Sequence, residues 1–405
     1  MFSLSRRSIS LVLLVGVLKV LLSAVAKVAS DFSNFTQMAK YDFVSLAHGI
    51  LPFNGVYTGI GIFLAPFYGF WLALPISHTN DLLLVLAMKV PVIVFDFLAG
   101  ALIYLVIKAA TMSSSYARKG FLIWYLNPYN ILLILMWGSV DVIPAVFLLL
   151  AILLSYKRKW SPAGLSLAVA SILRLFPILL FPAVLLCVLR QGRRAAASFT
   201  ASFLAPLAGA CGLLIMMFGS LQAVVNIFAN LALQESYLIF FGYPLLPDVS
   251  SFYNLRLALL MFALQLYVMK RFWKTPSSLL SPSLAFLLIL FAATPQMIYH
   301  FNWVTPLLTA DYVINRRRPR LFFLLFVSAF LVWFSGIGLP TGDRLLLFPS
   351  YTQGLRAAAE LLSTISPTLS ISHILFPGIF VGLLLCFLIS LNARSMRLFA
   401  GRKNS

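Results

Sequence analysis

The chain has 405 residues, of which 61% are hydrophobic and only 10% are charged, and its formal net charge is +20. About a quarter of the residues of a soluble globular domain are charged, so this composition excludes a soluble protein and predicts an integral membrane protein. The basic residues form short clusters between apolar bands and no continuous stripe, which argues against a nucleic-acid-binding protein.

Apolar bands of the size that crosses a bilayer recur along the whole chain. A hydrocarbon core about 30 Å thick requires roughly 20 apolar residues per helix. We predict spans near 9–26, 83–107, 120–137, 142–155, 162–174, 176–190, 196–218, 252–270, 279–294, 297–313, 320–338 and 371–392. The sequence therefore predicts one all-α domain over residues 1–405, a polytopic membrane helical bundle with about 12 transmembrane helices.

The basic clusters between these bands indicate the orientation of the chain. Cytoplasmic loops of membrane proteins are enriched in Lys and Arg. The clusters are Arg6–Arg7, Arg118–Lys119, Lys157–Lys159, Arg190–Arg194, Lys270–Arg271, Arg316–Arg320 and Arg394–Lys403. We interpret the band at 56–76 as a re-entrant or interfacial segment of the first outer loop that does not cross the membrane. With this assignment, all of the clusters and both termini are cytoplasmic.

This topology brings several polar residues to the extracytoplasmic side. They are Asp31, Asp42, Asp141, Arg174, Glu235, Asp248 and the polar run at 294–302. The predicted helices 142–155 and 162–174 are short for a bilayer, so we expect them to end at the rim of a cavity.

Asp141 and Arg174 are ionisable groups next to or within apolar spans. Each costs about 3 kcal/mol or more at membrane depth, so we expect both to have partners or to line a wet cavity. Two simpler interpretations stay open. In the first, Asp141 only caps the helix that begins at Val142. In the second, Arg174 only extends its side chain along the helix to the lipid headgroups.

The sequence gives no signal for a metal, nucleotide or other cofactor. The four histidines are scattered without ligand spacing. Gly59-Ile60-Gly61 is half of a dinucleotide-binding motif and has no strand before it, so we expect the donor of any group transfer to arrive as a lipid.

Five motifs in order resemble a known family. DFSNFTQMA (31–39) is similar to the D-Y-x-x-F-T-D-A-A stretch of GT-C superfamily mannosyltransferases that use polyprenyl- or dolichyl-phosphate mannose, most closely the catalytic subunit of GPI mannosyltransferase I. The other four are GILPF (49–53), LNPYNILLILMWGSVD (126–141), ILRLFPILLFP (172–182) and TPQMIYHFNWVTPLL (294–308). The resemblance implies a GT-C-like bundle between about residues 10 and 315.

The resemblance also implies an activity. It implies inverting, metal-independent transfer of a mannosyl or other hexosyl residue from a polyprenyl-phosphate sugar to an extracytoplasmic, or ER-lumenal, lipid-linked acceptor. A phosphate leaving group needs no general acid, so one carboxylate is enough to take the acceptor's proton, and Asp31 matches that residue. Arg174, in place of the family's lysine, would stabilise the leaving phosphate. Asp141, Gln296 and His300 would bind the sugar or the acceptor.

Two carboxylates follow the first span, and we expect them to differ. Phe32, Phe35 and Met38 recur at helical spacing, which predicts a short interfacial helix that holds Asp31 at the cavity. Asp42 is expected to be a solvated or locally paired surface charge.

Two functions of other classes stay open, a lipid or small-molecule transporter or flippase that uses the same cavity, and a non-catalytic membrane scaffold. The expected partners are the lipid-phosphate donor, the lipid-linked acceptor and membrane lipid, with an accessory subunit left open and no nucleic acid.

Overall fold

A computed structural model describes residues 6–25, 29–50, 52, 58–74, 81–127, 130–131, 134, 138–174, 176–222, 263, 279–281, 283–284, 287 and 302–315. Within these ranges every regular element is a helix, which confirms the predicted all-α fold.

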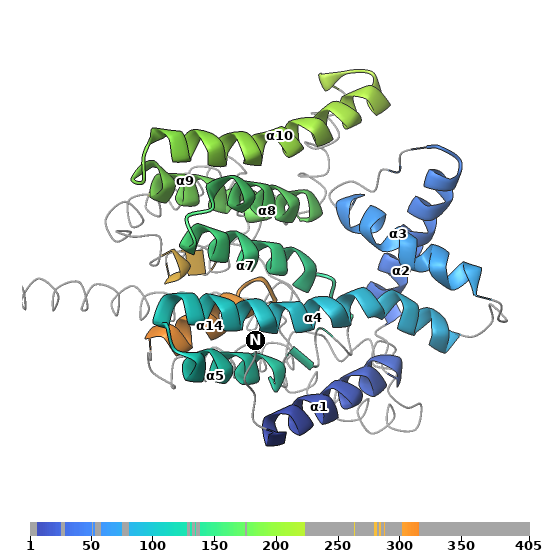
Figure 1. Ribbon diagram of the computed structural model, residues 1–405. Coiled ribbons are helices and arrows are strands. Elements are labelled where there is room, and N and C mark those ends of the chain that lie inside the picture. Colours follow the sequence, from blue (N-terminus) through green and yellow to red (C-terminus); the bar gives the residue numbers. More distant parts are fainter. Residues whose placement is uncertain are drawn as a thin grey trace, which may run out of the picture.

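The centre of the structure is a stack of helices whose axes run in similar directions (Figure 1). The helices are α10 (Arg193–Phe218), α8 (Trp160–Leu173), α7 (Val142–Tyr156), α4 (Asp81–Thr111) and α5 (Ser114–Tyr125). Each packs against the next in that order. Helices α4 and α5, and α7 and α8, are neighbours both in the chain and in space, whereas α4 lies between α5 and α7.

The remaining helices surround this stack. They are α1 (Arg6–Val25), α2 (Ala29–Ala47), α3 (Thr58–Ala73), the 3-10 helix η3 (Phe176–Leu180), α9 (Phe181–Leu189) and α14 (Thr305–Asn315). In Figure 1, α2 and α3 lie to the right of the stack, and α3 also packs against α4 and α8.

Helix lengths relate the stack to the bilayer. In the described part of the chain, α4 and α10 are long and apolar enough to cross a membrane. Helices α7 and α8 have only 15 and 14 residues, as the sequence predicted. At 1.5 Å per residue they are about 22 Å long, shorter than a hydrocarbon core of about 30 Å. Neither helix of this pair is therefore long enough to cross such a core by itself.

The predicted span 120–137 is wrong in its bounds, because α5 starts at Ser114 and ends at Tyr125. Ser113 caps its first turn by accepting a hydrogen bond from the backbone N–H of Tyr116. Pro128 follows shortly after the helix, and the residue before a proline avoids the α conformation. The predicted spans 252–270, 320–338 and 371–392 lie almost wholly outside the described residues.

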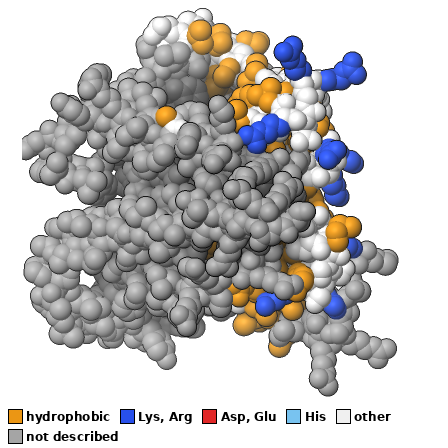
Figure 2. Space-filling view, turned by 90° about the vertical axis from the view of Figure 1, so that its left-hand side faces the viewer, with side chains coloured by type: hydrophobic (Ala, Val, Ile, Leu, Met, Phe, Trp, Pro, Cys, Tyr) orange, Lys and Arg blue, Asp and Glu red, His pale blue; other side chains and the backbone are white. Residues whose placement is uncertain are grey.

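Exposed basic residues gather at one end of the stack, on the left in Figure 1 and facing the viewer in Figure 2. This basic end includes the exposed side chains of Lys108, Lys119, Lys157, Arg158, Lys159, Arg190, Arg193 and Arg194. They flank the turns that join α4 to α5, α7 to α8 and α9 to α10. The common end agrees with the sequence prediction that these clusters share one side of the membrane.

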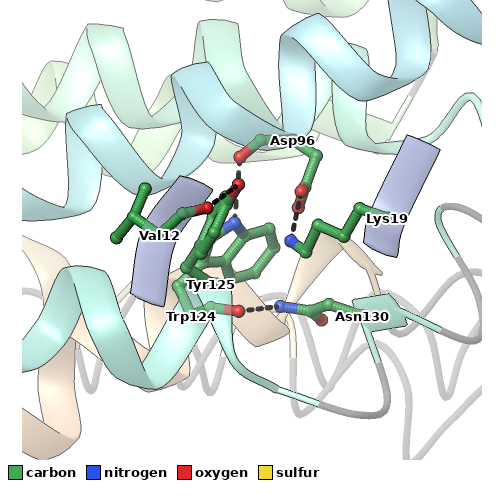
Figure 3. Close-up of polar contacts among 6 residues, drawn as sticks. All are labelled: Val12, Lys19, Asp96, Trp124, Tyr125 and Asn130. Carbon is green, nitrogen blue, oxygen red and sulfur yellow. Dashed lines mark hydrogen bonds and ion pairs between the residues drawn. The ribbon is translucent and has the colours of Figure 1, made fainter. Parts of the chain in front are cut away.

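Helix α1 is attached to the stack by buried polar contacts (Figure 3). The Lys19 ammonium lies 2.6 Å from the Asp96 carboxylate of α4 and 4.0 Å from the centre of the Tyr125 ring of α5. The Tyr125 hydroxyl donates to the Val12 carbonyl. This buried ion pair favours one arrangement of the helices, because a shifted helix would leave a charge unpaired in an apolar medium. Lys19 thus fixes the register of α1.

Candidate functional site

The centre of the candidate site is a buried ion pair between Arg174 and Asp141. The Arg174 Nε donates to Asp141 Oδ1 over 2.7 Å. The two residues are 33 positions apart in the chain, and their exposed fractions are 7% and 1%. The structure thus brings together two of the residues that the sequence singled out, and gives each the partner expected for a charge at membrane depth.

Local structure explains why both charges are stable here. Asp141 lies at the N-terminus of α7, and Arg174 lies at the C-terminus of α8. The helix dipole favours an anion at the first of these positions and a cation at the second. At Arg174 the backbone becomes extended, with φ −151° and ψ 138°, and the helix ends. The ion pair therefore joins the non-basic ends of the two short helices, about 22 Å from the basic end.

The two simpler interpretations of these residues do not fit the geometry. Asp141 occupies the N-cap position, but its side chain makes no capping hydrogen bond and its backbone is α-helical. Arg174 is buried and bonded to Asp141, so its side chain does not extend to a membrane surface. Both charges instead contribute to one polar centre.

Helix α3 supports this centre from the side. A Cβ atom at Gly59 would overlap with the carbonyl oxygen of Ile172 and lie 3.2 Å from the Cα of Leu173. Both residues belong to the last turn of α8, directly before Arg174. Glycine at position 59 thus allows α3 to approach the backbone that carries the arginine. The half motif at 59–61 is part of a helix that packs closely, and it forms no phosphate loop.

Helix α2 carries the predicted base. Asp31 is the third residue of α2, so the predicted short helix exists and extends to Ala47. The prediction for Asp42 is wrong, because this carboxylate is fully buried. The reason is the helix length. Asp42 lies seven residues after Phe35 and three after the buried Ala39, and therefore on the same face.

The two other predicted substrate-binding residues, Gln296 and His300, lie outside the described residues. The polar run 294–302 within the same motif ends at Asn302, which is not among the predicted site residues. Its side chain is fully buried, and neither its amide nitrogen nor its oxygen has a hydrogen-bond partner. Buried polar atoms without partners are uncommon and call for a ligand or water. An asparagine at the end of the polar run 294–302 was the available signal.

Among the described residues, no group of three or more His, Cys, Asp or Glu side chains is placed to hold a metal ion. Four described carboxylates are buried, at positions 42, 96, 141 and 311. Each lies in a different part of the chain.

These helices and buried charges define an integral membrane protein built as an all-α bundle, with a buried polar centre at the non-basic ends of two short helices. The chain belongs to the PIG-U family, because the family model described as GPI transamidase subunit PIG-U matches residues 4–244. The match covers more than half of the chain. It names a transamidase subunit, whereas the motifs resemble a mannosyltransferase.

A comparison with curated proteins finds no match. Among solved structures, the crystal structure of ArnT from Cupriavidus metallidurans bound to undecaprenyl phosphate is similar with a TM-score of 0.46 and 13% sequence identity. The alignment covers 95% of this chain and 77% of that chain. A likeness of this size carries no conclusion about function.

Proposed function

We propose that the chain is the membrane-embedded subunit of a GPI transamidase assembly and that it holds a phosphate-bearing, lipid-linked glycan at the Arg174–Asp141 centre. The family match supports the first part. The single observation that supports the second is the buried guanidinium of Arg174 at the C-terminus of the short helix α8, opposite the basic end.

The chemistry of that guanidinium fits a lipid phosphate. Arginine stays charged in a protein interior, and its planar donor group matches phosphate geometry. Asp141 makes the cation tolerable in an apolar surrounding before a ligand arrives. A phosphate that approaches the pair would share the arginine with Asp141. A headgroup phosphate lies close to the membrane surface, and the centre lies within about 8 Å of it, the difference between a 30 Å core and a 22 Å helix.

A second candidate function is mannosyl transfer from a polyprenyl-phosphate sugar, with the active site on the extracytoplasmic side. The position of Asp31 in the first turn of α2, directly after the first span, favours it. In this mechanism Asp31 is the base, Arg174 stabilises the leaving phosphate, and Asp141, Gln296 and His300 bind sugar or acceptor hydroxyls. The motifs that resemble those of mannosyltransferases support this second candidate function.

One set of variants separates the two functions. The experiment expresses two full-length proteins, the double variant Arg174→Met/Asp141→Leu and the single variant Asp31→Asn. The host cells lack their own copy of this protein. The subunit proposal predicts that the double variant still co-precipitates the transamidase subunits but lowers the display of a GPI-anchored reporter by at least tenfold. Lys40→Gln, an exposed lysine on α2, is the control and should display the reporter normally.

Failure of wild-type chain to co-precipitate any transamidase subunit would overturn the subunit proposal. The transferase candidate is tested with purified chain and labelled polyprenyl-phosphate mannose. It predicts transfer by the wild type and a loss of roughly 100- to 10,000-fold in Asp31→Asn. Absence of transfer by the purified wild-type chain would reject it.

A further inference from the structure

Asn302 is a buried side chain whose hydrogen-bonding groups are not used by the fold. Its exposed fraction is 0%, and neither its amide nitrogen nor its oxygen has a hydrogen-bond partner. Asn315, at the other end of the same segment, donates its amide to Asp311 Oδ1 over 2.6 Å and to Ser281 Oγ over 3.2 Å. A buried amide with two unpaired groups costs stability, so Asn302 calls for a role beyond the fold of the chain alone.

Helix geometry places Asn302 at the level of the Arg174–Asp141 centre. Helix α14 lies beside α4 and α5 with its C-terminus toward the basic end (Figure 1). The carboxylate of Asp311 interacts electrostatically with Tyr156, the last residue of α7, which supports this direction. The 11 residues of α14 span about 16 Å, and the turn before them adds about 6 Å. Asn302 is therefore about 22 Å from the basic end, like the far ends of α7 and α8.

Two further buried polar atoms without partners belong to the same end of the bundle. The hydroxyl of Ser139 lies two residues before Asp141, and this side chain is 3% exposed. Asn130 donates its amide to the Trp124 carbonyl near the end of α5, and its Oδ1 has no hydrogen bond (Figure 3). Neutral donors and acceptors from three segments thus lie at about the depth of one ion pair.

We propose that Asn302 binds hydroxyl groups of the glycan headgroup whose phosphate lies at the Arg174–Asp141 centre. The inference rests on the proposed function and adds the residue that distinguishes this headgroup from other lipid phosphates. A carboxamide donates through its nitrogen and accepts through its oxygen, and a hydroxyl does both, so two hydroxyls satisfy one asparagine. A phosphate diester offers acceptors alone and would leave the Asn302 oxygen unpaired.

Burial makes this recognition selective. The three side chains are covered in the structure, so a headgroup has to part the side chains around them before it binds. A headgroup with hydroxyls then supplies the hydrogen bonds that the fold lacks. A lipid without hydroxyls leaves the buried polar groups unpaired and therefore binds more weakly.

The test compares two radiolabelled lipids with the same acyl chains on purified full-length chain in micelles. The lipids are glucosaminyl-phosphatidylinositol and phosphatidylethanol, which both have a phosphate diester, but the headgroup of phosphatidylethanol has no hydroxyl. We expect the wild type to bind glucosaminyl-phosphatidylinositol at least about tenfold more tightly, as one or two hydrogen bonds supply. Asn302→Leu should remove most of this preference and leave phosphatidylethanol binding unchanged. Arg174→Met/Asp141→Leu should weaken the binding of both lipids.

Thermal unfolding separates a binding residue from a structural one. Asn302→Leu replaces the amide with an apolar group of similar size and removes two unpaired groups, so the midpoint should stay the same or rise. Asn315→Leu, the matched control on α14, breaks two hydrogen bonds and should lower the midpoint by about 2 °C or more while lipid binding stays normal. Asn302→Ser retains one hydroxyl and should keep part of the affinity, which gives a second measurement with a smaller side chain.

A lower midpoint for Asn302→Leu, or normal glucosaminyl-phosphatidylinositol binding by both Asn302 variants, would overturn this inference and leave the phosphate centre intact. Equal binding of both lipids by the wild type and by Arg174→Met/Asp141→Leu would instead reject the proposed function, and the inference with it. Weaker capture of an apolar peptide by Asn302→Leu, with unchanged lipid binding, would assign the amide to a peptide backbone and would also overturn the inference.

Discussion

The ion pair between Arg174 and Asp141 predicts a strong coupling between two residues that are 33 positions apart. Removal of one partner leaves the other charge buried, since both are less than a tenth exposed. Such a loss costs about 3–5 kcal/mol, whereas replacement of the whole pair by apolar side chains of similar volume is near neutral. We therefore expect Arg174→Met and Asp141→Leu each to destabilise the protein by about 3–5 kcal/mol, and the double variant to recover most of that loss.

The assay is equilibrium unfolding of the full chain in mixed micelles. The coupling energy is the change in the free energy of unfolding caused by the double variant minus the sum of the changes caused by the two single variants. Lys157→Gln is the control, because this residue is exposed at the opposite end of α7 and should change stability by less than about 0.5 kcal/mol. Additive single effects would show that the two charges do not interact. Single losses below 1 kcal/mol would show that the pair is solvated.

Two further predictions test the packing around the site. Asp96→Asn leaves Lys19 buried without its anion and should loosen α1, seen as faster proteolysis at the N-terminus and a loss of about 3–5 kcal/mol; unchanged protection of α1 would contradict the role of the pair. Gly59→Ala places a Cβ against the Ile172 carbonyl and should cost about 1–3 kcal/mol in thermal unfolding. Gly209→Ala, on α10 with no atom within 4 Å, should instead stabilise its helix by up to about 1 kcal/mol. Equal effects of the two glycine substitutions would refute close packing of α3 on α8.

Some features of the site were predictable from the sequence because they depend on local patterns. Asp141 and Arg174 stand out as charges at the ends of apolar bands, and the short bands around them predict α7 and α8 closely. The basic clusters predict a common end of the bundle. These inferences need only the cost of a charge in lipid and the thickness of a bilayer.

Other features depend on which helix faces meet, and the apolar pattern does not encode that. Lys19 and Asp96 are 77 residues apart, and each appears in the sequence as an isolated interruption of an apolar span. Asp42 was misjudged because the helix that begins at Ala29 continues past it. The early end of α5 was predictable, since Asn127-Pro128 lies inside the predicted span 120–137 and residues before proline avoid the helical conformation.

The most direct test of the account measures binding of a phosphate-bearing glycolipid to purified full-length chain. The probe is tritium-labelled glucosaminyl-phosphatidylinositol, and the proteins are the wild type, Arg174→Lys, Arg174→Met/Asp141→Leu and the control Lys40→Gln. We predict that the double variant stays folded but binds at least tenfold more weakly, that Arg174→Lys keeps part of the affinity, and that Lys40→Gln binds like the wild type. Equal binding by the wild type and the folded double variant would contradict the assignment of the Arg174–Asp141 centre to the lipid phosphate.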